Sequence, residues 1–129
     1  MRSPGPWLPL LVLLAACTGG EERNEAQLLL DRYGRLEQPS LEARRQAVDA
    51  FRALGVRSER VRAAQTACGA MQDALLRAEE ATRAARVARS ADEGEPALAR
   101  SAAALVEVER HKPACDRALA ALRARHAPR

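Results

Sequence analysis

Aromatic side chains are scarce in this chain of 129 residues, which contains one Trp, one Tyr and one Phe. Proteins that bind single-stranded nucleic acids or sugars use aromatic rings as stacking surfaces, so the scarcity argues against both kinds of ligand. The formal net charge of +4 falls to +3 if Arg2 is removed, and this small excess attracts a polyanion only weakly. We therefore expect no nucleic-acid partner.

The motifs of common enzyme classes are also missing. The sequence contains no Gly-rich phosphate loop, no His-Glu-x-x-His, no Gly-x-Ser-x-Gly and no Cys-x-x-Cys. Only His111 and His126 could act as a histidine base. Most carboxylates have an arginine three or four positions away, as Asp73 has Arg77, which is the pattern of a solvated helix face. These absences predict a protein without catalytic activity and without a cofactor.

The N-terminus has the order of a secretory signal peptide, with Arg2 followed by an apolar run from Trp7 to Ala16. That run is too short to span a bilayer as a mature helix. It ends in Leu14-Ala15-Ala16-Cys17, which resembles the lipobox of bacterial lipoproteins. The resemblance implies that the chain is cut before Cys17, that Cys17 carries the lipid, and that this lipid holds the protein on a membrane. The alternative is an ordinary signal peptide cut after Ala16.

The lipobox divides the chain into four expected parts. They are the signal peptide (1–16), the lipidated Cys17 with a polar tether (17–24), a single helical domain (25–125) and a frayed tail (126–129). Thr18 stands where an aspartate retains enterobacterial lipoproteins in the inner membrane. The resemblance therefore implies attachment to the outer membrane of the cell envelope, facing the periplasm.

Helical periodicity predicts four helices and no strands in the domain. The expected helices cover residues 25–38, 41–54, 59–90 and 97–125. A break at residues 91–95 places Pro96 at the first position of the last helix. Pro113 should kink that helix or split it into 97–111 and 114–125. The expected fold is an all-α antiparallel helical hairpin or bundle of three to four helices.

Each of the two long helices carries a heptad seam. The seam positions are Val61, Ala64, Cys68, Met71, Leu75, Ala78, Thr82 and Ala85 in the first helix and Leu98, Leu105, Val108, Cys115, Leu119 and Leu122 in the second. If the helices fold back around residue 93, Cys68 and Cys115 come level within about one helical turn. With Cys17 assigned to lipid, this even pair in an oxidising compartment predicts a disulfide.

A metal site is the alternative use of the same cysteines. His111 lies four positions before Cys115, and Met71 lies one turn from Cys68, so these four side chains could bind a soft metal if both thiols were free. That arrangement would suit a periplasmic metal-binding or stress-sensing module. Glu107 offers His111 a simple surface partner instead. The disulfide is preferred, and no metal is expected.

Leu28, Leu29 and Leu30 are too many adjacent apolar residues for one narrow stripe, so one of them should be exposed or lie in a groove. They are a weak indication of a partner surface, and burial against the hairpin is the alternative. The sequence as a whole predicts a non-enzymatic envelope lipoprotein that binds another envelope protein as a structural or assembly accessory. Its size, helical class and anchor are similar to those of some secretin pilotins, by analogy and not by motif.

Overall fold

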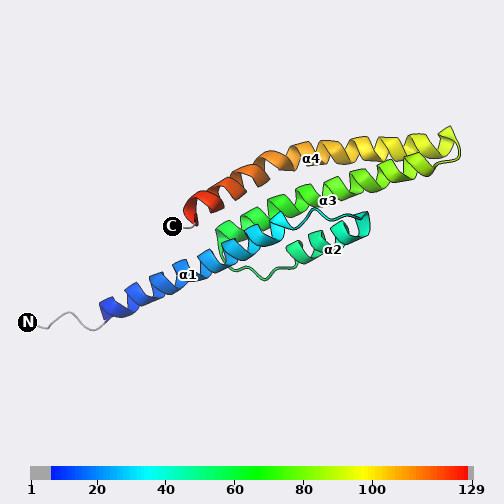
Figure 1. Cartoon of the computed structure of the whole chain (residues 1–129). Helices are drawn as coiled ribbons and strands as arrows, with labels where there is room; N and C mark the ends of the chain where they lie inside the picture. Colours follow the sequence, from blue (N-terminus) through cyan, green and yellow to red (C-terminus); the bar gives the residue numbers. More distant parts are fainter. Residues whose placement is uncertain (1–6, 128–129) are drawn as a thin grey trace, which may run out of the picture.

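The computed structural model describes the backbone of residues 7–127 and the side chains of residues 20–127. These residues form four α-helices and no strand: α1 (Trp7–Gly34), α2 (Leu41–Arg52), α3 (Glu59–Val87) and α4 (Ala91–Arg125). Figure 1 shows α3 and α4 as a long antiparallel hairpin, with α2 alongside α3 and α1 extending towards the N-terminus. The prediction of an all-α antiparallel hairpin or bundle is confirmed.

The turn of the hairpin lies earlier than the sequence predicts. The expected break is at residues 91–95, but α4 already begins at Ala91. N-capping by Ser90 accounts for this start, because the Ser90 hydroxyl accepts a hydrogen bond from the Glu93 N–H (3.4 Å). The Glu93 carboxylate in turn accepts one from the Arg89 N–H (3.2 Å). These two hydrogen bonds stabilise a helix start at Ala91, five residues before Pro96.

Both prolines of α4 lie inside the helix. Pro96, predicted as the first helical residue, is in the second turn. The helix continues through Pro113 to Arg125, and its ribbon bends in this C-terminal half (Figure 1). A proline removes one N–H donor and crowds the preceding turn, which bends a helix without ending it when both halves remain packed. Of the two predicted outcomes at Pro113, α4 shows the kink and not the split into two helices.

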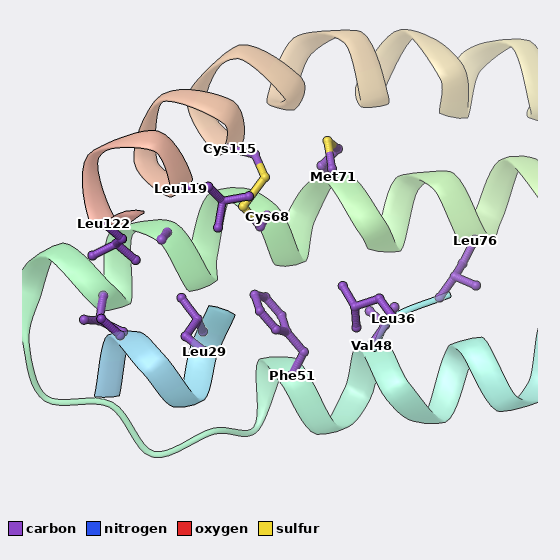
Figure 2. Close-up of a cluster of buried hydrophobic side chains, with 13 residues drawn as sticks. Leu29, Leu36, Val48, Phe51, Cys68, Met71, Leu76, Cys115, Leu119 and Leu122 are labelled. Atoms are coloured by element: carbon purple, nitrogen blue, oxygen red, sulfur yellow. A yellow bond between two sulfur atoms is a disulfide. The ribbon is translucent and has the colours of Figure 1, made fainter. Parts of the chain in front are cut away.

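The core lies where parts of all four helices meet (Figure 2). Phe51 of α2 is fully buried there, and its ring centroid is 5.9 Å from that of Tyr33 in α1, with the rings tilted by 59°. The larger buried side chains around it are Leu29, Leu36, Val48, Val61, Cys68, Met71, Leu76, Cys115, Leu119 and Leu122. This cluster packs α1 and α2 against the hairpin of α3 and α4.

The distal half of the hairpin, defined here as residues 78–106, packs through small side chains. Its buried residues are Ala78, Ala81, Ala97, Ser101 and Ala104. The predicted seam positions Leu98 and Leu105 are instead 57% and 48% exposed, so this part of the predicted seam is wrong. Small residues let two helix backbones approach closely, which leucines would prevent. Heptad spacing alone could not show that alanines and a serine would form the contact.

Hydrogen bonds of Ser101 fix the rotation of α4 in this half. Its hydroxyl donates to the Ala78 carbonyl (3.1 Å) and lies 2.8 Å from the Thr82 hydroxyl. Thr82 donates to the same Ala78 carbonyl (2.9 Å). A buried hydroxyl without a partner would be costly, so these bonds favour the register in which Ser101 faces α3. That register turns Leu98 and Leu105 outwards.

The predicted polar tether is helical instead. Residues 18–24 belong to α1. The Glu22 carboxylate in this segment accepts a hydrogen bond from His126 Nε2 (3.0 Å) and forms an ion pair with Arg125 Nε (3.0 Å). Arg60 Nη1 of α3 lies 3.6 Å from the same oxygen. We call these four side chains the Glu22 cluster. It gives a polar segment partners on two other helices, so the chain has a reason to stay helical there.

The tail is ordered at its first residue, contrary to the prediction of a frayed end at residues 126–129. His126 caps α4, because its N–H donates to the Leu122 carbonyl (2.9 Å). Its side chain is only 6% exposed, held by Glu22. Ala127 is exposed, and residues 128–129 lie outside the described residues.

Glu25 caps the start of α3 from a distant part of the chain. Its carboxylate accepts hydrogen bonds from the backbone N–H groups of Arg57 (2.8 Å) and Ser58 (2.9 Å). Burial alone would raise the pKa of Glu25, but the bonds from Ser58 and Arg57 outweigh it and lower the pKa below its ordinary value of 4.5. In the Glu22 cluster, the hydrogen bond from His126 is the main cause that lowers the pKa of Glu22 below 4.5.

These two carboxylates should make the fold acid-sensitive. A lowered folded-state pKa contributes stability that is complete above the unfolded value of 4.5 and is lost as the pH falls through the folded value. The double variant Glu22→Gln, Glu25→Gln should therefore lose less unfolding free energy than the wild type between neutral pH and about pH 3. Urea denaturation followed by circular dichroism measures this difference. The matched control is Glu21→Gln, an exposed neighbour, and equal pH dependence of double variant and wild type would refute the assignment.

Candidate functional site

The predicted lipidation site, Cys17, lies in the α1 segment whose side chains are outside the described residues. The backbone at Cys17 is helical, and Glu22 follows five positions later. No described helix combines the length and the apolarity needed to cross a bilayer. Lipid attachment at Cys17 stays a prediction.

The predicted disulfide between Cys68 and Cys115 is confirmed. Their sulfurs are bonded, their Cα atoms are 4.6 Å apart, and both side chains are fully buried (Figure 2). Such a short distance between two helices requires small neighbours, and Ala64, one turn before Cys68, is fully buried. The Tyr33 hydroxyl lies 3.9 Å from Cys115 Sγ. The disulfide joins the two long helices in the middle of the core, out of reach of thiols in solution.

The four residues of the alternative metal site do not form a ligand set in this oxidation state. The sulfurs of Cys68 and Cys115 are bonded to each other, and Met71 is buried in the core. His111 is half-exposed, with Nε2 3.6 Å from Glu107 Oε2. Among the described residues, no three His, Cys, Asp or Glu side chains are grouped so that they could hold a metal ion. Sequence spacing placed His111 near Cys115 along the chain, but their side chains have different partners.

The three leucines considered as a partner surface have different environments. Leu29 is fully buried and Leu30 packs against the core, whereas Leu28 is 45% exposed. One exposed leucine is ordinary on a protein surface. Leu28 to Leu30 therefore form no continuous apolar patch.

A shallow groove of about 490 Å³ runs between the distal parts of α3 and α4. Its lining consists of Arg77, Glu80, Ala81, Ala84, Arg100, Ala103, Ala104 and Glu107. Three of the four charges at its edges already have partners: Arg77 with Asp73, Glu80 with Arg45, and Glu107 with Arg110. The lining of the groove contains four alanines and no histidine, serine or cysteine, and its two carboxylates, Glu80 and Glu107, are engaged by arginines.

The most unusual surface is the outer side of α4. The stretch Pro96–Val106 contains a single charged residue, Arg100, in a chain of which 29% is charged. α3 covers Ala97, Ser101 and Ala104. The residues that remain exposed are Leu98, Ala99, Ala102, Ala103, Leu105 and Val106. A helix that is apolar nearly all round is normally buried on more than one side. This stretch is covered on one side only.

We define the α4 strip as Leu98, Ala102, Leu105 and Val106. At 100° per residue these positions fall within an arc of about 100° on the helix. Leu98, Leu105 and Val106 are between 48% and 58% exposed. Sequence reasoning assigned Leu98 and Leu105 to the inner seam and so missed the strip. The signal that could have revealed it is the near absence of charge from Pro96 to Val106, which leaves no polar outer face.

The other helices leave the strip open because they pack on α3. Figure 1 shows α3 lying between α4 and α2. Ion pairs of Arg44 with Glu79 and of Arg45 with Glu80 hold α2 along α3. Gln65 of α3 also donates to the carbonyls of Phe51, Arg52 and Leu54 at the end of α2. The outer side of α4 therefore has no cover from the described chain.

Comparison of the chain with protein-family models, with curated proteins and with solved structures gave no match in any of the three.

Proposed function

We propose that this protein is a lipid-anchored lipoprotein of the bacterial envelope that binds another envelope protein as a structural or assembly accessory, in the manner of a pilotin. The observation that carries the binding role is the α4 strip, an apolar surface with no cover on a disulfide-bonded hairpin. The anchor is supported by Leu14-Ala15-Ala16-Cys17 at the end of an apolar run. Attachment to the outer membrane, facing the periplasm, is part of the proposal.

A binding role is better supported than catalysis. The groove between α3 and α4 is lined by alanine, arginine and glutamate, and most of its charges are paired. The two histidines are engaged with carboxylates, His111 with Glu107 and His126 with Glu22. A rigid hairpin with an apolar face resembles a docking element more than a reaction centre.

The anchor is tested by the variant Cys17→Ser, expressed as the full chain in a bacterial host. The wild type should fractionate with the outer membrane on a density gradient, and its intact mass should correspond to a chain that starts at an acylated Cys17. The variant should lack the acyl mass, because serine has no thiol for the thioether bond. The control is the double variant Cys68→Ser, Cys115→Ser, which should keep the acyl mass. A wild-type chain cut after Ala16 without acyl groups would mean an ordinary secreted protein.

A further inference from the structure

Two exposed acidic residues lie on the same arc of α4 as the strip. Glu95 precedes the strip and Glu109 follows it, each seven positions from Ala102 and about 21 Å apart from each other. Neither makes a salt bridge among the described residues. Lys112, one turn beyond Glu109, is bonded to Asp116 instead (2.6 Å). The outer side of α4 is thus an apolar strip with an unpaired negative charge at each end.

We infer that the α4 strip binds an amphipathic α-helix of a partner protein, with an apolar face that covers Leu98 and Leu105 and a basic residue at each end that meets Glu95 and Glu109. The inference rests on the proposed protein-binding function and names the partner's chemistry. A helix fits because the strip runs along one face of α4 for about two turns and is bordered on one side by the exposed small residues Ala99 and Ala103. Small residues beside a ridge allow a second helix to lie close, as α3 lies against Ala97 and Ala104 on the inner side.

The charges disfavour a second copy of this chain as the occupant. An antiparallel pair of α4 helices crossing at Ala102 would place Glu95 of one copy opposite Glu109 of the other, because both are seven positions from Ala102. A parallel pair would place each glutamate opposite itself. Like charges across an interface oppose association, so either pairing is penalised at both ends. An anionic membrane surface is disfavoured for the same reason.

The test uses a labelled synthetic peptide of about six helical turns, with Leu and Ala on one face and a Lys seven positions on either side of its centre. A second peptide carries Glu at those two positions. Fluorescence anisotropy with the full chain should show binding of the Lys peptide and at least about tenfold weaker binding of the Glu peptide. The double variant Leu98→Asn, Leu105→Asn should weaken binding of the Lys peptide at least about tenfold. Leu28→Asn, at a similarly exposed leucine of α1, is the matched control and should leave binding unchanged.

A charge reversal separates recognition from any effect on folding. In the variant Glu95→Lys, Glu109→Lys, the preference should invert, so that the Glu peptide binds more tightly than the Lys peptide. Equal binding of both peptides, or no binding of the Lys peptide, would overturn the inference. So would strip-dependent dimerisation in analytical ultracentrifugation, or strip-dependent binding to vesicles of phosphatidylglycerol and phosphatidylethanolamine. Peptide binding and the acyl mass at Cys17 are separate measurements. A failure of peptide binding would therefore leave the lipid anchor unaffected, and a missing lipid would leave the binding result unaffected.

Discussion

Replacing both core cysteines, as Cys68→Ala with Cys115→Ala, should lower the free energy of unfolding by about 4 kcal/mol. The disulfide closes a loop across a sequence separation of 47, and in the chain-entropy model a cross-link of this length restricts the unfolded state by about that amount. Small domains have a total stability of roughly 5–15 kcal/mol, so the loss is a large fraction of it. Equilibrium denaturation in urea, followed by circular dichroism, measures the shift in midpoint.

Reduction of the wild type while it is unfolded in urea, where the buried disulfide becomes accessible, should give a loss of similar size, because it removes the same cross-link. The control is Cys17→Ser, which leaves the core untouched and should keep the wild-type midpoint. A double-alanine variant with an unchanged midpoint would show that the hairpin is held by packing alone.

The variant Phe51→Ala should cost about 3–5 kcal/mol of unfolding free energy, the usual loss for a large aromatic side chain removed from a core. Phe51 is fully buried and is the largest such side chain of the described residues. It also contacts the Tyr33 ring, so its removal weakens the attachment of both α2 and α1. Urea denaturation measures the loss, and Phe51→Leu, which keeps most of the apolar volume, should lose clearly less.

A Phe51→Ala variant within about 1 kcal/mol of the wild type would contradict this account of the core. It would mean that α2 contributes little to the global stability and is held on the surface of α3 mainly by its ion pairs with Glu79 and Glu80. Proteolysis of α2 in the folded protein would then be expected to match that of an exposed loop.

The hairpin and its disulfide could be predicted from the sequence because both depend on residue spacing along the chain. Heptad spacing identifies a long helix, and one break between two such helices gives an antiparallel pair. Counting residues on both sides of the turn then shows that Cys68 and Cys115 lie opposite each other along the hairpin. The count tolerates the error in the turn. With the turn at Ser90, Cys68 lies 22 positions before it and Cys115 lies 25 after it, so the two cysteines are still level within about one helical turn.

Two features escaped prediction because they depend on contacts between distant parts of the chain. Residues 18–24 have the composition of a tether, and only Arg60 and the end of α4 give Glu22 its partners. His126 is the fourth residue from the end of the chain, and its side chain is held by the same carboxylate. No local pattern in the sequence brings residues 22, 60 and 126 together.

The buried face of α4 escapes prediction for a different reason. Heptad spacing gives large apolar residues more weight than small ones, so it predicts Leu98 and Leu105 inside in preference to Ala97, Ser101 and Ala104, which are the buried residues. The buried hydroxyl of Ser101 and the close approach of two alanine faces reverse that ranking. Of the predicted site, the disulfide is therefore established, the lipid at Cys17 stays a prediction, and the α4 strip emerged only with the fold.

The Glu22 cluster also determines how a lipid-bound molecule would stand on its membrane. With the proposed lipid on Cys17, fewer than two helical turns separate the acyl chains from a carboxylate held by both α3 and α4. The bundle then has no freedom to swivel on a loose stalk. Because α1 is helical from Cys17 to Glu22, the proposed lipid would then fix the orientation of the whole bundle relative to the membrane, and with it the direction in which the α4 strip faces.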